Sequence, residues 1–237
     1  MRPNVENILF LDIETVPQYE CFNDAPENTQ NFWAKKIKNS LKQDETAEQV
    51  YNRAGIWAEF GKIICISAGF IHKKDDKNVF RVKSFYGDDE KDILIDFIEN
   101  LKKFVSRNKK ETLLCAHNGK EFDFPYLARR ILINKIDLPK LFDVGGKKPW
   151  EVPFLDTMEL WRFGDYKNYT SLDLIANVFD IPSPKGDIDG SDIADVYYNQ
   201  KDLERIAMYC EKDVLTLARV YLRLKEHYEI EFDLIND

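Results

Sequence analysis

The sequence predicts an α/β fold in which helices flank a mixed sheet of five strands. Apolar strand patterns come first in the chain, and segments with helical spacing separate the later strands, an order that favours helices packed against one sheet. The chain has 237 residues, 44% of them hydrophobic, which suffices for one substantial core without requiring a second domain. We therefore expect a single domain over residues 1–237.

Three strands are expected before any long helix of the main fold. Residues 7–13 are largely apolar, residues 62–71 predict a buried strand, and residues 79–86 alternate as a half-exposed strand does. Three consecutive strands of this kind suggest an antiparallel start to the sheet.

A long amphipathic helix is expected next, because its apolar residues recur at the spacing of one helix face. Acidic residues at 88–90 precede it, as expected for an N-cap followed by an acidic first turn. A fourth strand at 112–116, a helix at 124–133 and a short fifth strand at 154–156 follow. The apolar positions of the long helix are Ile93, Leu94, Phe97, Ile98, Leu101 and Phe104.

The remaining segments are an insertion, a helical region and a tail. The insertion at 17–61, between the first two strands, contains many apolar and aromatic residues and predicts two helices packed on the sheet edge. From Ser171 onward every periodic segment is helical. The acidic tail at 226–237 is expected to be either a solvated edge or a frayed end.

The charge and the cysteines exclude several classes of protein. The formal net charge of −8 argues against nucleic-acid binding through a broad Lys/Arg surface, although it allows a site where divalent cations bridge carboxylates to a phosphate. The four cysteines are scattered without a C-x-x-C pair, so neither a disulfide framework nor a zinc site is indicated. They are Cys21, Cys65, Cys115 and Cys210.

Membrane insertion and export are not indicated. The longest apolar run, at 63–71, falls well short of the roughly 20 residues that cross a bilayer. The apolar stretch at 8–11 runs directly into Asp12 and does not resemble a signal peptide. We expect a cytoplasmic protein that does not bind membranes.

The first candidate site is the segment Phe10-Leu11-Asp12-Ile13-Glu14-Thr15. Side chains of a strand alternate between its faces, so Asp12 and Glu14 project from one face at the end of an apolar strand. Two crowded carboxylates need a cation, a shared proton or a salt bridge, and oxygen ligands suit Mg²⁺ or Mn²⁺. A surface acidic pair beyond a strand end remains an equal alternative for this motif alone.

Two further segments carry acidic residues in defined positions. In 117–127, Asp123 lies where the fourth strand passes into a helix, and a plain helix cap would explain it as well. Tyr209 and Asp213 are four residues apart in a predicted helix and so lie on one face, where an ordinary helix-surface hydrogen bond is the alternative. The three segments together are far more specific than each alone.

These segments resemble the three exonuclease motifs of the DnaQ-like, DEDD-type exonucleases, which have a ribonuclease-H-like fold. The matching sequences are F-L-D-I-E-T, H-N-G-K-E-F-D-F-P-Y-L and Y-C-E-K-D-V-L-T. The chain is most similar to the proofreading exonuclease domain of family B DNA polymerases, in a stand-alone version. The similarity extends over most of the chain and is weakest in the insertion at 17–61.

The resemblance implies a role for each motif residue. Asp12 would bridge two divalent cations, Mg²⁺ or Mn²⁺. Glu14 and Asp213 would complete the first metal site, and Asp123 would hold the second cation through water. Tyr209 would position the attacking water, which places the chain in the tyrosine (DEDDy) branch.

The implied activity is 3′ to 5′ hydrolysis of single-stranded nucleic acid that has a free 3′ end, with release of nucleoside 5′-monophosphates. DNA is favoured over RNA by family likeness alone. Candidate substrate-binding residues are Asn118 and Phe122 in the second motif, and Lys148, Trp150 and Lys185, since a cation beside an aromatic ring can hold a phosphate and stack a base.

Three sequence features allow an alternative interpretation. Residues 87–92 read G-D-D-E-K-D and imitate a phosphatase motif, but Glu14 replaces the second aspartate that such enzymes need, so we interpret them as a helix cap. Asp156 either supports the site or only caps the following helix. A catalytically inactive binding module with this fold ranks below the enzyme, because all four carboxylates and Tyr209 are present.

Overall fold

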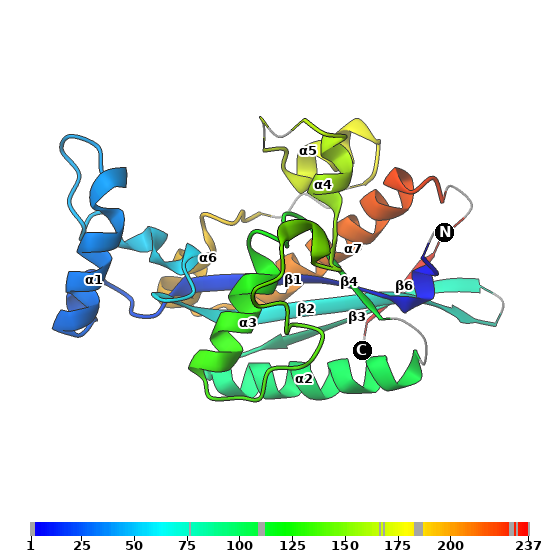
Figure 1. Cartoon of the computed structure of the whole chain (residues 1–237), viewed down its shortest axis with the longest axis horizontal. Helices are drawn as coiled ribbons and strands as arrows, with labels where there is room; N and C mark the ends of the chain where they lie inside the picture. The colour runs from blue at the N-terminus through cyan, green and yellow to red at the C-terminus, as the bar shows by residue number, and fades with distance from the viewer. Residues whose placement is uncertain are drawn as a thin grey trace.

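A six-stranded mixed sheet forms the centre of the computed structural model (Figure 1). The structure describes residues 3–75, 77–108, 112–165, 167, 169–182, 187–227, 230 and 232–236. Across the sheet the strand order is β5-β4-β1-β2-β3-β6. The strands are β1 Ile8–Pro17, β2 Gly61–Lys74, β3 Lys77–Tyr86, β4 Leu113–Ala116, β5 Leu155–Asp156 and β6 Asp233–Asn236.

The strand pairing confirms the predicted mixed sheet and its antiparallel start. β2 pairs antiparallel with both β1 and β3, while β4 pairs parallel with β1 and β5 pairs parallel with β4. The acidic tail was expected to be a solvated edge or a frayed end, and its residues 233–236 form β6, the edge strand that pairs parallel with β3. The outer edge of β3 would otherwise present unpaired N–H and C=O groups, and β6 satisfies them.

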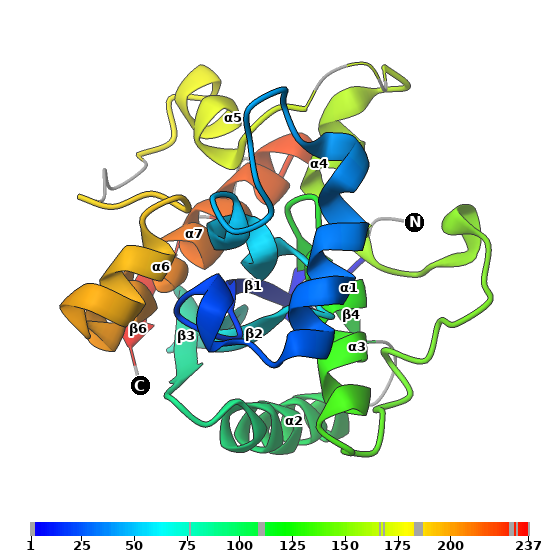
Figure 2. The same cartoon turned by 90° about the vertical axis from the view of Figure 1, so that its left-hand side faces the viewer.

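Helices cover both faces of the sheet (Figures 1 and 2). α2 and α3 pack on one face, where the predicted apolar side of α2 is buried, and α7 packs on the other. A π-helical turn at Val196–Gln200 precedes α7. The α-helices are α1 Glu27–Ile37, α2 Glu90–Arg107, α3 Asp123–Ile133, α4 Thr157–Arg162, α5 Leu172–Val178, α6 Ile193–Asp195 and α7 Leu203–Leu224.

Aromatic packing fixes α7 against the sheet. The ring of Phe10 on β1 lies edge-on to Tyr221 of α7, with 5.5 Å between the ring centroids, and contacts Phe80 of β3 at 6.2 Å. All three side chains are fully buried. Rings at these distances in tilted or edge-on geometry attract one another beyond the area that they bury. The face of β1 that carries the even-numbered residues therefore meets α7 in a defined register.

The insertion contains one α-helix where two helices were expected. α1 packs through Trp33, which is fully buried among aromatic rings, and the second predicted helix is the 3-10 helix Tyr51–Ile56. The insertion lies beyond the end at which β1 leaves the sheet (Figures 1 and 2). The carbonyl of Gly55 anchors it there, accepting hydrogen bonds from Thr15 Oγ1 at 2.9 Å and Tyr126 Oη at 2.8 Å.

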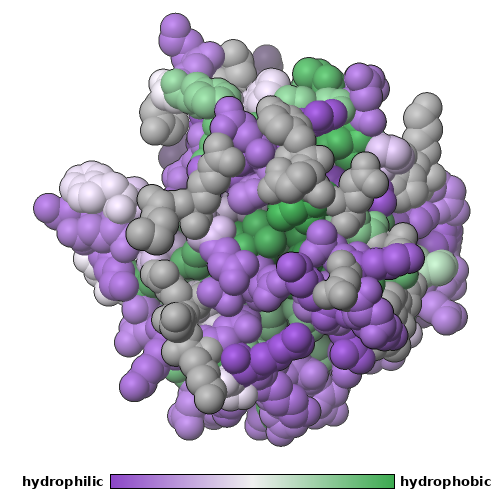
Figure 3. Space-filling model, turned by 90° about the vertical axis from the view of Figure 1, so that its right-hand side faces the viewer, coloured by the Kyte–Doolittle hydropathy of each residue, from purple (hydrophilic) through white to green (hydrophobic). Residues whose placement is uncertain are grey.

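The opposite end of the molecule is mainly hydrophilic, with a small group of hydrophobic side chains gathered at the centre of that face (Figure 3). None of the helices in the described ranges is long and apolar enough to cross a membrane.

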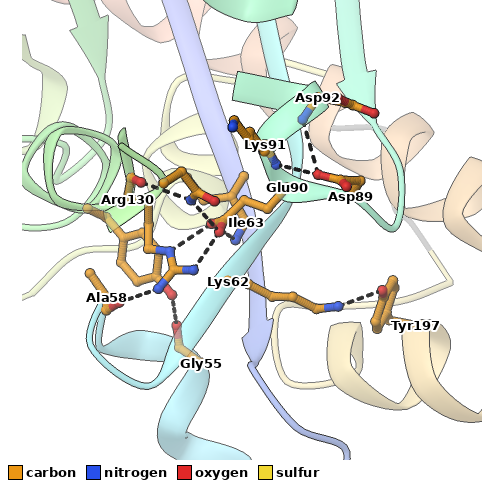
Figure 4. Close-up of polar contacts among 12 residues, drawn as sticks. Gly55, Ala58, Lys62, Ile63, Asp89, Glu90, Lys91, Asp92, Arg130 and Tyr197 are labelled. Atoms are coloured by element: carbon orange, nitrogen blue, oxygen red, sulfur yellow. Dashed lines mark hydrogen bonds and ion pairs between the residues drawn. The ribbon is translucent and has the colours of Figure 1, made fainter. Parts of the chain in front are cut away.

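A buried ion pair joins α2 to α3 (Figure 4). Asp89 caps α2 as predicted, because its side chain accepts hydrogen bonds from the backbone N–H groups of Lys91 and Asp92. Glu90, which the sequence assigned only to an acidic first turn, receives two hydrogen bonds from Arg130 and one from the N–H of Ile63 at 2.8 Å. Arg130 also donates to the carbonyl of Ala58 at 2.9 Å. This one pair therefore connects two helices, β2 and the end of the insertion.

We predict that Arg130→Ala lowers the free energy of unfolding by about 3–5 kcal/mol, because it leaves the carboxylate of Glu90 buried without its main partner. Urea denaturation measures the change. As a control, Lys42→Ala removes an exposed ion pair with Glu45 and should cost less than about 1 kcal/mol. If Arg130→Ala lowers the free energy of unfolding as little as the control does, the pair of Glu90 and Arg130 does not hold the two helices together.

Candidate active site

The two carboxylates of the first motif lie side by side on β1, on the face that α7 covers. Asp12 and Glu14 pair across the sheet with Ser67 and Cys65 of β2, and a register irregularity follows Glu14. Glu14 is only 8% exposed. The thiol of Cys210 on α7 lies 3.4 Å from Asp12 Oδ2, so the helix directly touches the first carboxylate.

Asp123 is the first residue of α3 and is almost completely buried. Its Oδ1 atom has no hydrogen-bond partner within the residues that the structure describes. A buried carboxylate oxygen without a partner is costly, so the position calls for a group that supplies positive charge.

Asp156, at the end of β5, holds the loop that leads to Asp123. It accepts hydrogen bonds from the backbone N–H groups of Asn118 and Lys120, both at 3.0 Å. It also caps α4 by accepting from Met158 N at 2.9 Å. Both interpretations of Asp156 therefore hold, and Asn118 takes a left-handed backbone conformation with φ of 58° within this turn.

One cavity of about 350 Å³ brings the three motifs together. All five residues predicted to be catalytic line it, although they come from β1, the start of α3 and the middle of α7. Two of the five predicted substrate-binding residues, Asn118 and Phe122, line it as well. The other lining residues are Ile13, His117, Tyr169, Ser171, Leu172, Asp173 and Gly190.

The carboxylates of the cavity are crowded and poorly solvated. Burial raises the pKa of Asp12 and of Glu14 well above the ordinary value, and the neighbouring carboxylates raise both further. Burial also raises the pKa of Asp123 to about 7 and that of Asp213 to about 6, although a hydrogen bond from Tyr209 partly offsets the second shift. Four buried carboxyl groups with raised pKa values favour the binding of a cation, because a cation stabilises their charged forms.

Tyr209 is held as a neutral hydroxyl. Burial raises its pKa, and the negative charges of Asp213, Glu14 and Asp12 raise it further. A phenol in this environment keeps its proton and serves as a hydrogen-bond donor.

The donor set fits a hard divalent cation. One ligand atom from each of Asp12, Glu14 and Cys210 lies within 4.8 Å of the others. The carboxylate oxygens, including the unpartnered Oδ1 of Asp123, suit Mg²⁺ or Mn²⁺, which prefer oxygen ligands.

Sequence reasoning missed three residues of the cavity wall. Tyr169 is 66% exposed and lies against His117, with 6.4 Å between ring centroids. His117 is fixed by hydrogen bonds to Thr157 Oγ1 at 2.8 Å and to the carbonyl of Thr170 at 2.9 Å. Asp173 lies in the first turn of α5, where an acidic residue is ordinary, so its sequence position gave no signal.

Lys148 and Trp150 lie outside the cavity lining. Trp150 is 76% exposed, and the ammonium of Lys148 lies 5.3 Å from the centroid of its ring. Lys185 falls outside the residues that the structure describes.

Comparison with known proteins identifies the family. Residues 56–234 match the family model for a predicted 3′ to 5′ exonuclease related to the exonuclease domain of family B DNA polymerases (PolB). The chain belongs to this family. The match covers the second and third motifs and begins after β1, so the Asp12 and Glu14 segment and most of the insertion lie outside it. No curated protein matches the chain.

A solved structure shares the fold of this exonuclease family member. The family B DNA polymerase from the hyperthermophilic archaeon Pyrobaculum calidifontis superposes with a TM-score of 0.55 at 15% sequence identity. The match covers 91% of this chain and 24% of the polymerase, so the chain spans about a quarter of that protein's length. The ribonuclease-H-like α/β fold and the predicted likeness to a polymerase exonuclease domain are thereby confirmed.

We predict that Asp123 and Asp213 contribute to the stability of the metal-free protein by an amount that grows as the pH falls from about 7 toward about 4, opposite in sign to the contribution of His72 and His117, whose pKa values burial lowers. The folded pKa values of about 7 for Asp123 and about 6 for Asp213 lie above the ordinary 3.8, so the folded state binds more protons than the unfolded state in this range. Urea denaturation with EDTA at a series of pH values measures the trend.

Asp123→Asn combined with Asp213→Asn removes both groups and serves as the control for this pH dependence. The double variant should lose this part of the pH dependence, because neither amide titrates. If the wild type and the double variant respond equally to pH, the crowding of these carboxylates does not influence stability.

Proposed function

We propose that this exonuclease family member is an active 3′ to 5′ exonuclease of the DEDDy type that acts on single-stranded nucleic acid by a two-metal mechanism. The observation that carries the proposal is the convergence of four carboxylates and Tyr209 on one cavity. Family membership supports the reaction class, and the crowded negative charge supports the need for cations.

Each carboxylate would bind one or both of the two cations, according to its position. The charges of both Asp123 and Asp213 act on Asp12, which would contact both ions; Glu14 and Asp213 would complete the first site, and Asp123 would hold the second, through water. Bound divalent cations of this kind lower the pKa of a coordinated water and stabilise charge on a leaving oxygen.

The residues of the chain would then position the reacting groups. Tyr209 donates a hydrogen bond to Asp213 through its phenolic proton, and its oxygen can accept a hydrogen bond from the attacking water, which would leave that water's lone pair free to face the terminal phosphorus. Asp213, one helical turn away, accepts a hydrogen bond from Tyr209 and keeps the ring in place. Tyr209 is therefore a positioning group and not the base.

The cavity wall suggests how the 3′ terminal nucleotide would bind. Phe122 and the exposed Tyr169 offer ring faces for a base, and the amide of Asn118 lies in the loop that Asp156 holds. Lys148, Trp150 and Lys185 remain predicted contacts for nucleotides farther along the strand. We favour DNA over RNA as the substrate on family likeness, and release of nucleoside 5′-monophosphates follows from cleavage at the terminal phosphodiester.

We predict that Asp213→Ala lowers kcat more than about 100-fold, since even residues that only support metal ligands contribute about 10- to 100-fold. Release of mononucleotides from a labelled single-stranded oligonucleotide with Mg²⁺ or Mn²⁺ measures this. The fold should remain intact, because the substitution removes one crowded charge. Glu204→Ala, an exposed carboxylate on the same helix, is the matched control and should retain wild-type activity.

Wild-type turnover by folded Asp213→Ala would contradict the assignment of this residue. No metal-dependent release by the wild-type protein would instead indicate an inactive binding module that has kept the exonuclease fold.

We predict that Tyr209→Phe lowers kcat by roughly 10- to 100-fold and leaves KM nearly unchanged, because it removes only the hydroxyl that orients the water. Manganese affinity, measured by calorimetry, should fall much less than kcat, because the hydroxyl is not a ligand and acts on the metals only through its hydrogen bond to Asp213. An equal loss of manganese affinity and activity would show that Tyr209 acts through the metals.

A further inference from the structure

A second hollow lies on the face of the sheet opposite the cavity. It is a groove of about 300 Å³ between α2 and the strands β2 and β3, and Leu9 of β1 contributes to it. The odd-numbered residues Leu9 and Leu11 face the core beneath α2 and α3, whereas Phe10 and Asp12 face α7. The groove is therefore separated from the carboxylates by the thickness of the sheet.

The floor of the groove is apolar and its walls are positively charged. Phe70, Phe85 and Phe104 lie among the apolar side chains of the floor. Two exposed cations come from each wall: Arg81 and Lys83 stand two residues apart on β3, and Lys103 and Arg107 stand four residues apart on α2. Among the residues that the structure describes, no Asp or Glu lines the groove, in a chain whose formal net charge is −8.

The cations lie over the groove and not away from it. The guanidinium of Arg107 lies 5.5 Å from the ring centroid of Phe70, and the ammonium of Lys83 lies 5.3 Å from that of Phe85. The neighbouring His72 responds to the same charges, because its pKa is lowered by burial and further by Arg107 and Arg81. A ligand in the groove would therefore meet positive potential from both sides.

We propose that this groove binds a short acidic peptide segment of a partner protein, with an apolar side chain on the floor and carboxylates against both walls. Arginine is suited to bidentate contact with carboxylates, and lysine supplies a mobile point charge. Matching positive and negative surfaces speed association and select the partner. This binding does not depend on the nuclease reaction.

A nucleic-acid strand fits the groove less well. Sequence-tolerant binding of single strands uses aromatic faces on which bases stack. Phe85 and Phe104 are each only 7% exposed, so their faces are largely covered by the protein. The floor can accept a methyl group or the edge of a ring, which the side chain of a leucine or phenylalanine provides.

The test uses a short fluorescein-labelled peptide in which acidic residues flank a central Phe-Leu pair, and its binding to the full chain is followed by fluorescence anisotropy. We expect saturable binding that weakens as salt rises, because exposed charges are screened. Replacing the Phe-Leu pair by Ser-Ser should weaken binding by at least about tenfold.

Charge reversal tests whether the walls are responsible. The double variant Lys83→Glu, Lys103→Glu should bind the peptide at least about tenfold more weakly than the wild type. The matched control Lys77→Glu, Lys102→Glu reverses the same number of charges on the same two elements, outside the groove lining, and should bind like the wild type. All three proteins should hydrolyse oligonucleotides equally, or lack that activity equally.

Three outcomes would overturn the proposal. The first is that the peptide shows no saturable binding. The second is that both double variants bind the peptide equally weakly. The third is that the protein binds a labelled oligo-dT strand but not the peptide, and that Lys83→Glu, Lys103→Glu loses the binding of oligo-dT. The last would assign the groove to nucleic acid.

Discussion

The structure depends on the confinement of four carboxylates within one cavity of about 350 Å³. Burial raises the pKa of every one of them, and repulsion from the other carboxylates of the set raises the pKa of Asp12 and Glu14 further, so the metal-free site is a local cost to folding. Crowded carboxylates of this kind persist in a folded protein under two conditions. A ligand of opposite charge must offset their unfavourable electrostatic energy, and the surrounding structure must prevent the groups from moving apart. The proposed cations would supply the first condition, and the packing of the sheet and helices supplies the second.

That packing places each acidic group on a regular element. The alternation of β1 sets Asp12 and Glu14 on one face, and the contact of Phe10 with Tyr221 fixes α7 above them. Asp156 holds the loop before Asp123 through two backbone hydrogen bonds. Behind α3, the pair of Glu90 with Arg130 connects that helix to α2, to β2 and to the end of the insertion. A site built on strands and helices in this way keeps its geometry better than one built on loops.

Much of the fold and most of the candidate site could be predicted from the sequence, because short-range patterns determine the strands, the helices and the faces from which side chains project. Apolar runs predicted the first two strands, period-two alternation predicted the third, and helical spacing predicted the buried side of α2. The pattern D-x-E, D, Y-x-x-x-D indicated the residues that meet in the cavity, since each spacing sets the face from which its side chains project.

The features that the sequence could not predict depend on contacts between distant segments. The tail becomes β6 only because the edge of β3 is open to it, and Glu90 looks like any acidic residue at a helix start until Arg130 is placed 40 residues away. Tyr169 and Asp173 carry ordinary loop and helix-start signals, and Lys148 and Trp150 form a plausible binding pair in the sequence but lie outside the cavity lining.

The central claim is that the converging carboxylates hold two divalent cations. Titration of the metal-free protein with Mn²⁺ in a calorimeter tests it directly, because it counts ions without requiring a substrate. The account predicts two manganese ions per chain in the wild type, and weakened binding at both positions in Asp12→Asn, since Asp12 would contact both. No binding to the wild type, or the same isotherm for the wild type and Asp12→Asn, would contradict it.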